Sequence, residues 1–69
     1  MSEPEWTPPV PGPSGWYVTR LRGHNSDRLR CEVAVSKKGE ISVRLGELDY
    51  PGAAQAILAC HQIAAARLG

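Results

Sequence analysis

Two short segments of the chain alternate between apolar and polar residues. Residues 29–35 read LRCEVAV and residues 41–45 read ISVRL, so the odd positions are apolar and the even ones are mostly charged or small. A period of two is typical of β-strands, because successive side chains of a strand point to opposite faces of the sheet. The two segments are therefore predicted to be strands with one apolar face and one face rich in arginine.

A third strand is predicted before them, at residues 16–22. This segment reads WYVTRLR, and aromatic and β-branched residues favour strands. Residues 23–27 (GHNSD) have the composition of a turn, and residues 36–39 (SKKG) form a four-residue hairpin connection. Gly39 suits the left-handed position that closes a type I turn with a bulge. The three strands are expected to form an antiparallel meander.

The sequence leaves two registers open for the strand at residues 16–22. A shift of one residue exchanges its two faces and would move Arg20 and Arg22 to the core side. The other register keeps both arginines outward. In that register the inward side chains are Tyr17, Thr19 and Leu21, and the outward ones are Trp16, Val18, Arg20 and Arg22.

A helix is predicted from Ala53 to Leu68, where apolar residues recur at spacings of three and four. Pro51 suits the first position of a helix, with Asp49 or Tyr50 as its cap. The helix is expected to cover the apolar face of the strands. The predicted core is made of Leu29, Cys31, Val33, Val35, Ile41, Val43, Leu45, Ile57, Cys60 or His61, Ala64 and Leu68.

Together these elements predict an α+β fold, a three-stranded antiparallel β-meander packed on one C-terminal α-helix (β-β-β-α), over residues 16–69. Residues 1–15 hold five of the six prolines. Proline fixes the backbone and lacks an amide donor, so this segment is predicted to be an extended or disordered tail outside the sheet. Its Trp6 either folds back on the domain or contacts a partner.

A chain of 69 residues is long enough for one small domain. A ligand cavity of roughly 300 Å³ would take up most of its core. No nucleophile lies beside a base in a recognisable pattern, so we expect no enzyme, no small-molecule substrate and no cofactor. His24, Cys31, Cys60 and His61 lack the spacing of a zinc site, so no metal is expected either.

The sequence contains no apolar run that could span a bilayer and no start typical of a signal peptide. These features predict a cytoplasmic protein without a membrane partner, in which Cys31 and Cys60 are reduced thiols in the core. The formal net charge is +1, and Glu3 and Glu5 lie in the tail, so the predicted domain is mildly basic. The frequent Ala, Arg, Gly and Pro residues are typical of GC-rich genomes and favour a bacterial or phage source.

Residues 43–56 read VRLGELDYPGAAQA and follow two predicted hairpins. With these features the chain resembles the AP2/ERF DNA-binding family, and it is similar to the arm-type DNA-binding domains of phage and transposon tyrosine integrases. The resemblance covers residues 16–69 loosely and residues 43–56 best. It implies that the three-stranded sheet enters the major groove of duplex DNA. The contact residues that it implies are Arg20, Arg22, Arg28, Arg30, Lys37, Lys38 and Arg44.

The sequence thus predicts duplex DNA binding through the arginine-rich face, because guanidinium groups bind guanine edges and phosphates in pairs of hydrogen bonds. RNA binding is a smaller alternative. Under another interpretation this face is only solvated, and Arg30 or Arg44 pairs with Glu32 or Glu40 across strands. The remaining alternative is a protein-interaction module, either a homodimer or a phage-encoded binder of a host protein. That module would use the uncharged helix face together with Trp6, Tyr50 and Leu58.

Overall fold

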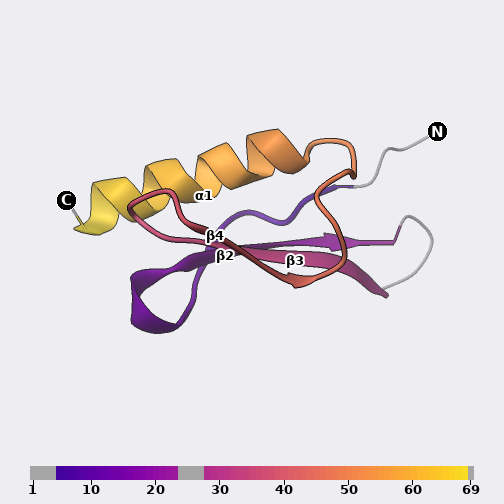
Figure 1. The fold of residues 1–69 in the computed structure, drawn as a ribbon, viewed down its shortest axis with the longest axis horizontal. Helices are drawn as coiled ribbons and strands as arrows, with labels where there is room; N and C mark the ends of the chain where they lie inside the picture. Colours follow the sequence, from indigo (N-terminus) through magenta and orange to yellow (C-terminus); the bar gives the residue numbers. More distant parts are fainter. Residues whose placement is uncertain (1–4, 24–27, 69) are drawn as a thin grey trace.

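Four antiparallel strands form one sheet, and helix α1 lies across one of its faces (Figure 1). The strands are β1 (Val10–Pro11), β2 (Tyr17–Arg22), β3 (Leu29–Val35) and β4 (Ile41–Leu45), and they follow chain order in the sheet. The short 3-10 helix η1 (Pro13–Gly15) precedes β2, and α1 (Ala53–Leu68) follows β4. This computed structural model describes residues 5–23 and 28–68. The predicted α+β class is confirmed, with four strands where three were expected.

The pairing of β2 with β3 decides between the two registers left open by the sequence. Thr19 lies opposite Val33 and Leu21 opposite Cys31, and all four side chains are buried. Leu21, Val33 and Cys31 belong to the core cluster that includes Cys60 of α1. The odd positions of β2 therefore face the helix, and its even positions face the other side of the sheet.

Three side chains that were expected in the core are exposed instead. Ile41, Val43 and Leu45 of β4 are 47%, 41% and 45% exposed. For Ile41 and Val43 the prediction was wrong because α1 packs against β2 and β3 rather than against the whole sheet. A helix is about 10 Å wide and strands lie about 4.8 Å apart, so one helix covers about two strands.

A bulge in β3 breaks the predicted alternation near the start of the strand. Leu21 lies opposite Cys31, but the next residue, Arg22, lies opposite Leu29. Arg30 is therefore the extra residue of β3, with no residue of β2 opposite it. This bulge takes Leu29 out of the inward set, and its side chain is only half-buried.

A second bulge lies in β4. Val33 is opposite Val43, but the preceding residue of β3, Glu32, is opposite Leu45. Arg44 is therefore the extra residue of β4. Because of this insertion Leu45 shares a row with Glu32, on the face away from the helix, and not with the core.

The proline-rich segment pairs with β2, so the predicted tail outside the sheet is corrected for residues 5–15. Val10 and Pro11 lie opposite Val18 and Tyr17. Nearby, the Thr7 amide donates to the Arg20 carbonyl at 2.8 Å. Proline is tolerated here because an edge strand needs amide donors on one side only.

Trp6 fastens this segment to both layers of the fold. It forms an isolated bridge with Leu21 and packs against the core cluster. Its indole N–H donates to the carbonyl of Pro51, just before α1, at 2.9 Å. Of the two possibilities left open for Trp6, the structure shows that it folds back on the domain.

The turn before α1 differs from the predicted helix start. The Ala53 amide donates to the Tyr50 carbonyl at 3.2 Å, which closes a turn with Pro51 and Gly52 at its centre. Gly52 has a φ of +83°, which is outside the helical range, so α1 begins at Ala53, as the apolar spacing predicted. Pro51 is thus a turn residue, and neither Asp49 nor Tyr50 caps the helix. Within the described ranges, no helix is long and apolar enough to cross a membrane.

The β3–β4 turn has the predicted form. The Gly39 amide donates to the Ser36 carbonyl at 3.0 Å, and the Ser36 amide donates to the Glu40 carbonyl at 3.0 Å. Gly39 has a φ of +88°, as expected for the left-handed residue after a type I turn. The Ser36 hydroxyl also accepts from the amides of Lys38 and Glu40.

We expect replacement of Trp6 to destabilise the whole domain. Trp6→Ala should lower the free energy of unfolding by about 2 kcal/mol, since it removes a half-buried aromatic side chain. Trp6→Phe keeps much of the packing but loses the hydrogen bond to Pro51, and should cost about 1 kcal/mol. Urea unfolding followed by circular dichroism measures both. An unchanged midpoint in Trp6→Ala would show that residues 5–15 are not part of the cooperative unit.

Gly46 and Gly39 form a matched pair for a second test of the fold. Both have positive φ, but a Cβ at position 46 would collide with the Arg30 carbonyl oxygen, whereas one at 39 would lie 3.6 Å from the His61 ring. Gly39→Ala should therefore cost about 1 kcal/mol from backbone strain alone, and Gly46→Ala about 3 kcal/mol. Equal losses in urea unfolding would contradict the tight approach of Gly46 to β3.

Candidate nucleic-acid interface

The face of the sheet away from α1 has two unlike halves. Near η1 it is apolar and covered: Val18 and Ala34 lie opposite each other and are 5% and 2% exposed. Their cover includes the turn between β1 and β2, since a Cβ on Gly12 would lie 2.9 Å from Val18 Cγ2. In Figure 1 this turn hangs below the sheet, on the side opposite α1.

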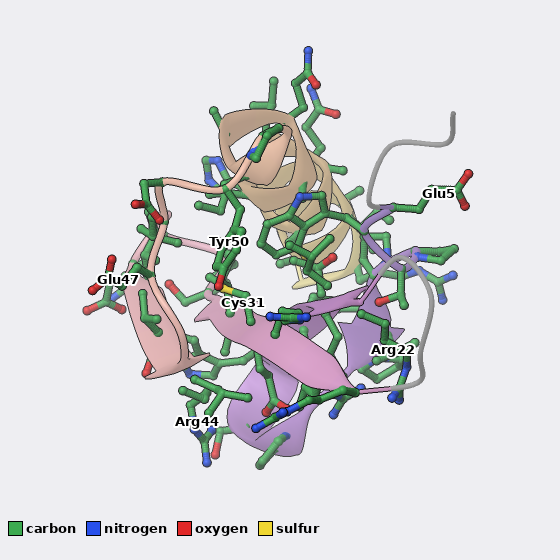
Figure 2. The ribbon with its side chains drawn as sticks, turned by 90° about the vertical axis from the view of Figure 1, so that its right-hand side faces the viewer. Glu5, Arg22, Cys31, Arg44, Glu47 and Tyr50 are labelled. Carbon is green, nitrogen blue, oxygen red and sulfur yellow. The ribbon has the colours of Figure 1, made fainter. Side chains whose placement is uncertain are left out.

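The other half of the sheet carries the predicted arginines. We call it the arginine end and define it by Arg20, Arg22, Arg28, Arg30 and Arg44. Arg20 is half-buried, and the other four are exposed. Figure 2 looks onto this end: Arg44 points away from the helix, whereas Cys31 and Tyr50 lie on the helix side of the sheet. The structure thus brings five of the seven predicted contact residues to one end of the sheet.

Arg20 is paired with an acidic neighbour. It lies directly opposite Glu32, and its Nε lies 3.0 Å from Glu32 Oε1. The solvated interpretation expected Glu32 to pair with Arg30 or Arg44, but the observed partner is Arg20. An ion pair this exposed adds little stability, so its main effects are to orient Arg20 and to cancel its charge.

Arg30 and Arg44 stand at the two bulges described above. Bulges reorient side chains, and they occur often next to functional sites. Both arginines are exposed. Glu40, four residues before Arg44, accepts a hydrogen bond from the Ser36 hydroxyl at 3.3 Å.

A hollow of about 240 Å³ lies beside Arg44 on this face. It is lined by Pro13, Ser14, Trp16, Ala34, Ser42 and Arg44. A guanidinium group, a hydroxyl group and an indole ring therefore meet at one place, which suits a phosphate together with a sugar or base. Trp16 and Ser42 could not be recognised from the sequence as residues of this site, because their proximity to Arg44 depends on the β2–β3–β4 register and on the η1 turn.

Lys37 and Lys38 are not brought together with the arginines. They lie in the β3–β4 turn, at the opposite end of β3 from Arg30, and seven residues of strand span about 23 Å. They line a different hollow of about 370 Å³ with Ser14, Gly15, Ser36 and Glu40. The predicted set of seven basic residues therefore divides into an arginine end and a lysine turn.

The residues predicted for protein binding are divided as well. Trp6 and Tyr50 pack against the core cluster, so part of their apolar surface is used within the domain. Leu58 on α1 is 54% exposed and remains available.

Cys31, Cys60 and His61 contribute to the packing and hydrogen bonding of the fold. Burial raises the pKa of the Cys31 thiol, and it raises that of Cys60 to about 11, so both thiols stay protonated at neutral pH. His61 Nε2 donates to the Lys37 carbonyl at 3.2 Å and ties α1 to the β3–β4 turn. No cluster of three or more His, Cys, Asp or Glu residues that could hold a metal exists among residues 5–23 and 28–68. His24, the fourth Cys or His residue weighed as a metal ligand, lies outside the described residues.

The chain was compared with protein-family models, curated proteins and solved structures. None of these comparisons gave a match.

The raised pKa of Cys60 predicts a specific pH dependence of stability. The ordinary thiol pKa is 9.0, so the buried neutral thiol stabilises the fold fully below pH 9 and loses this contribution as the pH rises to about 11. The difference in unfolding free energy between wild type and Cys60→Ala should therefore narrow across this window. Urea titrations at pH 8, 9, 10 and 11 measure it. A constant difference would contradict the burial of this thiol.

Proposed function

We propose that this domain binds duplex DNA through the arginine end of its sheet. The observation that supports the proposal most is the grouping of Arg20, Arg22, Arg28, Arg30 and Arg44 at one end of the sheet. Of these five, Arg20 is paired with Glu32. Guanidinium groups hold phosphate oxygens or guanine edges with two parallel hydrogen bonds. A group of positive charges on one surface favours a polyanion.

The dimensions of the sheet agree with this ligand. Strands β2, β3 and β4 span about 10 Å between their axes, and the major groove of B-form DNA is about 12 Å wide. The turn around η1 covers the other half of the face, so the duplex would approach from the arginine end. The resemblance of residues 43–56 to AP2/ERF and integrase arm-type domains points to the same face, and it stays a prediction.

Trp16 adds a contact that phosphate binding alone does not need. Its ring borders the hollow that contains Arg44 and Ser42. An aromatic ring beside a guanidinium can pack on a sugar or an unstacked base while the charge holds the phosphate. We expect Trp16 to modulate affinity and the arginines to supply the salt dependence.

The test is fluorescence anisotropy of a labelled mixed-sequence duplex at two salt concentrations. Replacing both Arg30 and Arg44 by alanine should weaken binding at low salt by about tenfold or more. The same double variant should flatten the salt slope by about one for each phosphate that the protein no longer neutralises. Replacing both Lys37 and Lys38 by alanine removes the same charge at the other end of the sheet. This control should change the affinity much less.

Two results would contradict the proposal. Equal losses of affinity in the arginine and lysine double variants would show that binding follows net charge and not the arginine end. An unaltered anisotropy of the duplex with wild-type protein at low salt would show that the arginine end is a solvated surface.

A further inference from the structure

The two edges of the sheet differ in their ability to accept another strand. The β1 edge lies in a segment with prolines at 8, 9, 11 and 13, and proline offers no amide for pairing. The β4 edge, Ile41 to Leu45, contains no proline. An edge strand of this kind presents amides and carbonyls that can pair with another chain.

The surface beside this edge is apolar. Ile41 and Val43 point to the helix side of the sheet but are 47% and 41% exposed, because α1 lies over β2 and β3. His61 contacts the β3–β4 turn, which places that side of α1 toward β4. Leu58 lies three residues before His61, so it shares this side, and it is 54% exposed.

The sequence of the edge is complementary to itself. Residues 40–44 read EISVR. In an antiparallel pair centred on Ser42, Ile41 of each copy lies opposite Val43 of the other. On the other face, Glu40 of each copy lies opposite Arg44. Two apolar pairs and two pairs of opposite charge result, and such cross-strand pairs stabilise a sheet.

Neighbouring registers lack this match. Centring the pair on Val43 places Arg44 opposite Ser42 and Glu40 opposite Gly46. Centring it on Ile41 places Arg44 opposite Lys38, a like charge. The charge pattern therefore selects the register centred on Ser42.

We propose that two copies of this chain associate through β4, antiparallel and centred on Ser42, to form a continuous eight-stranded sheet. The occupant of the exposed edge is a second copy because the edge supplies both members of each charge pair itself. This inference does not depend on DNA binding. A guanidinium has five N–H donors, so Arg44 can hold Glu40 of the second copy and still have donors for a phosphate.

Variants that reverse the charge at position 40 or 44 test the proposed register of the dimer. The mass of the full chain in solution is measured by sedimentation over a range of concentrations without DNA, and we expect a dimer. Arg44→Glu places two glutamates opposite each other, and Glu40→Arg places two arginines. Each variant should weaken dimerisation by about tenfold or more, whereas the double variant, with the charges exchanged, should restore it to within a few-fold.

Lys38→Glu is the matched control, because it changes the net charge by the same amount as Arg44→Glu in the turn outside the strand. It should leave the dimer unchanged. Circular dichroism checks that each variant is folded. Binding of Glu40→Arg to DNA reports separately on the arginine end, which this variant leaves intact.

A cysteine at the centre of the pair tests the same register without charge. Ser42→Cys places the two new thiols opposite each other, so mild oxidation should link the two chains, while the native Cys31 and Cys60 are buried. Lys38→Cys should not link. A monomer at every concentration, a dimer indifferent to both charge reversals, or equal linking at positions 42 and 38 would each overturn the proposal.

Discussion

The structure depends on the packing of one narrow helix against a wider sheet. Strands at about 4.8 Å spacing make four strands about 14 Å wide between the outer axes, whereas a helix is about 10 Å across. α1 packs on β2 and β3, where its Cys60 and Ala64 are small and fully buried. Small side chains let the helix lie close to the larger residues Val33 and Leu21. The outer strands β1 and β4 therefore depend on other cover.

The cover of the outer strands differs between the two sides of α1. On the β1 side, Trp6 packs against the core and binds the Pro51 carbonyl, so a segment from the start of the chain completes the domain. On the β4 side, the apolar side chains of Ile41 and Val43 remain partly exposed to solvent. The two edges of the sheet therefore differ: β1 contains proline and lies beside the segment that Trp6 anchors, whereas β4 is apolar and exposed. This asymmetry is why the inference of a second copy concerns β4 alone.

The sequence predicted the elements whose signals are local. Period-two alternation identified β3 and β4, and the spacing of apolar residues located α1 at Ala53–Leu68. The bulges at Arg30 and Arg44 could not be predicted, since they exist only relative to a neighbouring strand. Strand β1 was not predicted, for a related reason. Proline content argued against it locally, while the contacts that hold the segment join Trp6 to residues far along the chain.

The candidate site shows the same limit. Arginine at outward positions could be predicted, but the gathering of arginines at one end follows from what covers the other. Where η1 lies over the sheet, the outward positions are Val18 and Ala34, which are buried. Where that cover ends, the outward position becomes Arg20, paired with Glu32, and the bulged Arg44 follows. This face of the sheet is therefore apolar where the η1 turn covers it and charged where it is open to solvent. Any ligand of the face meets the arginines first and reaches Trp16 only at the boundary between the two halves, where the hollow lies.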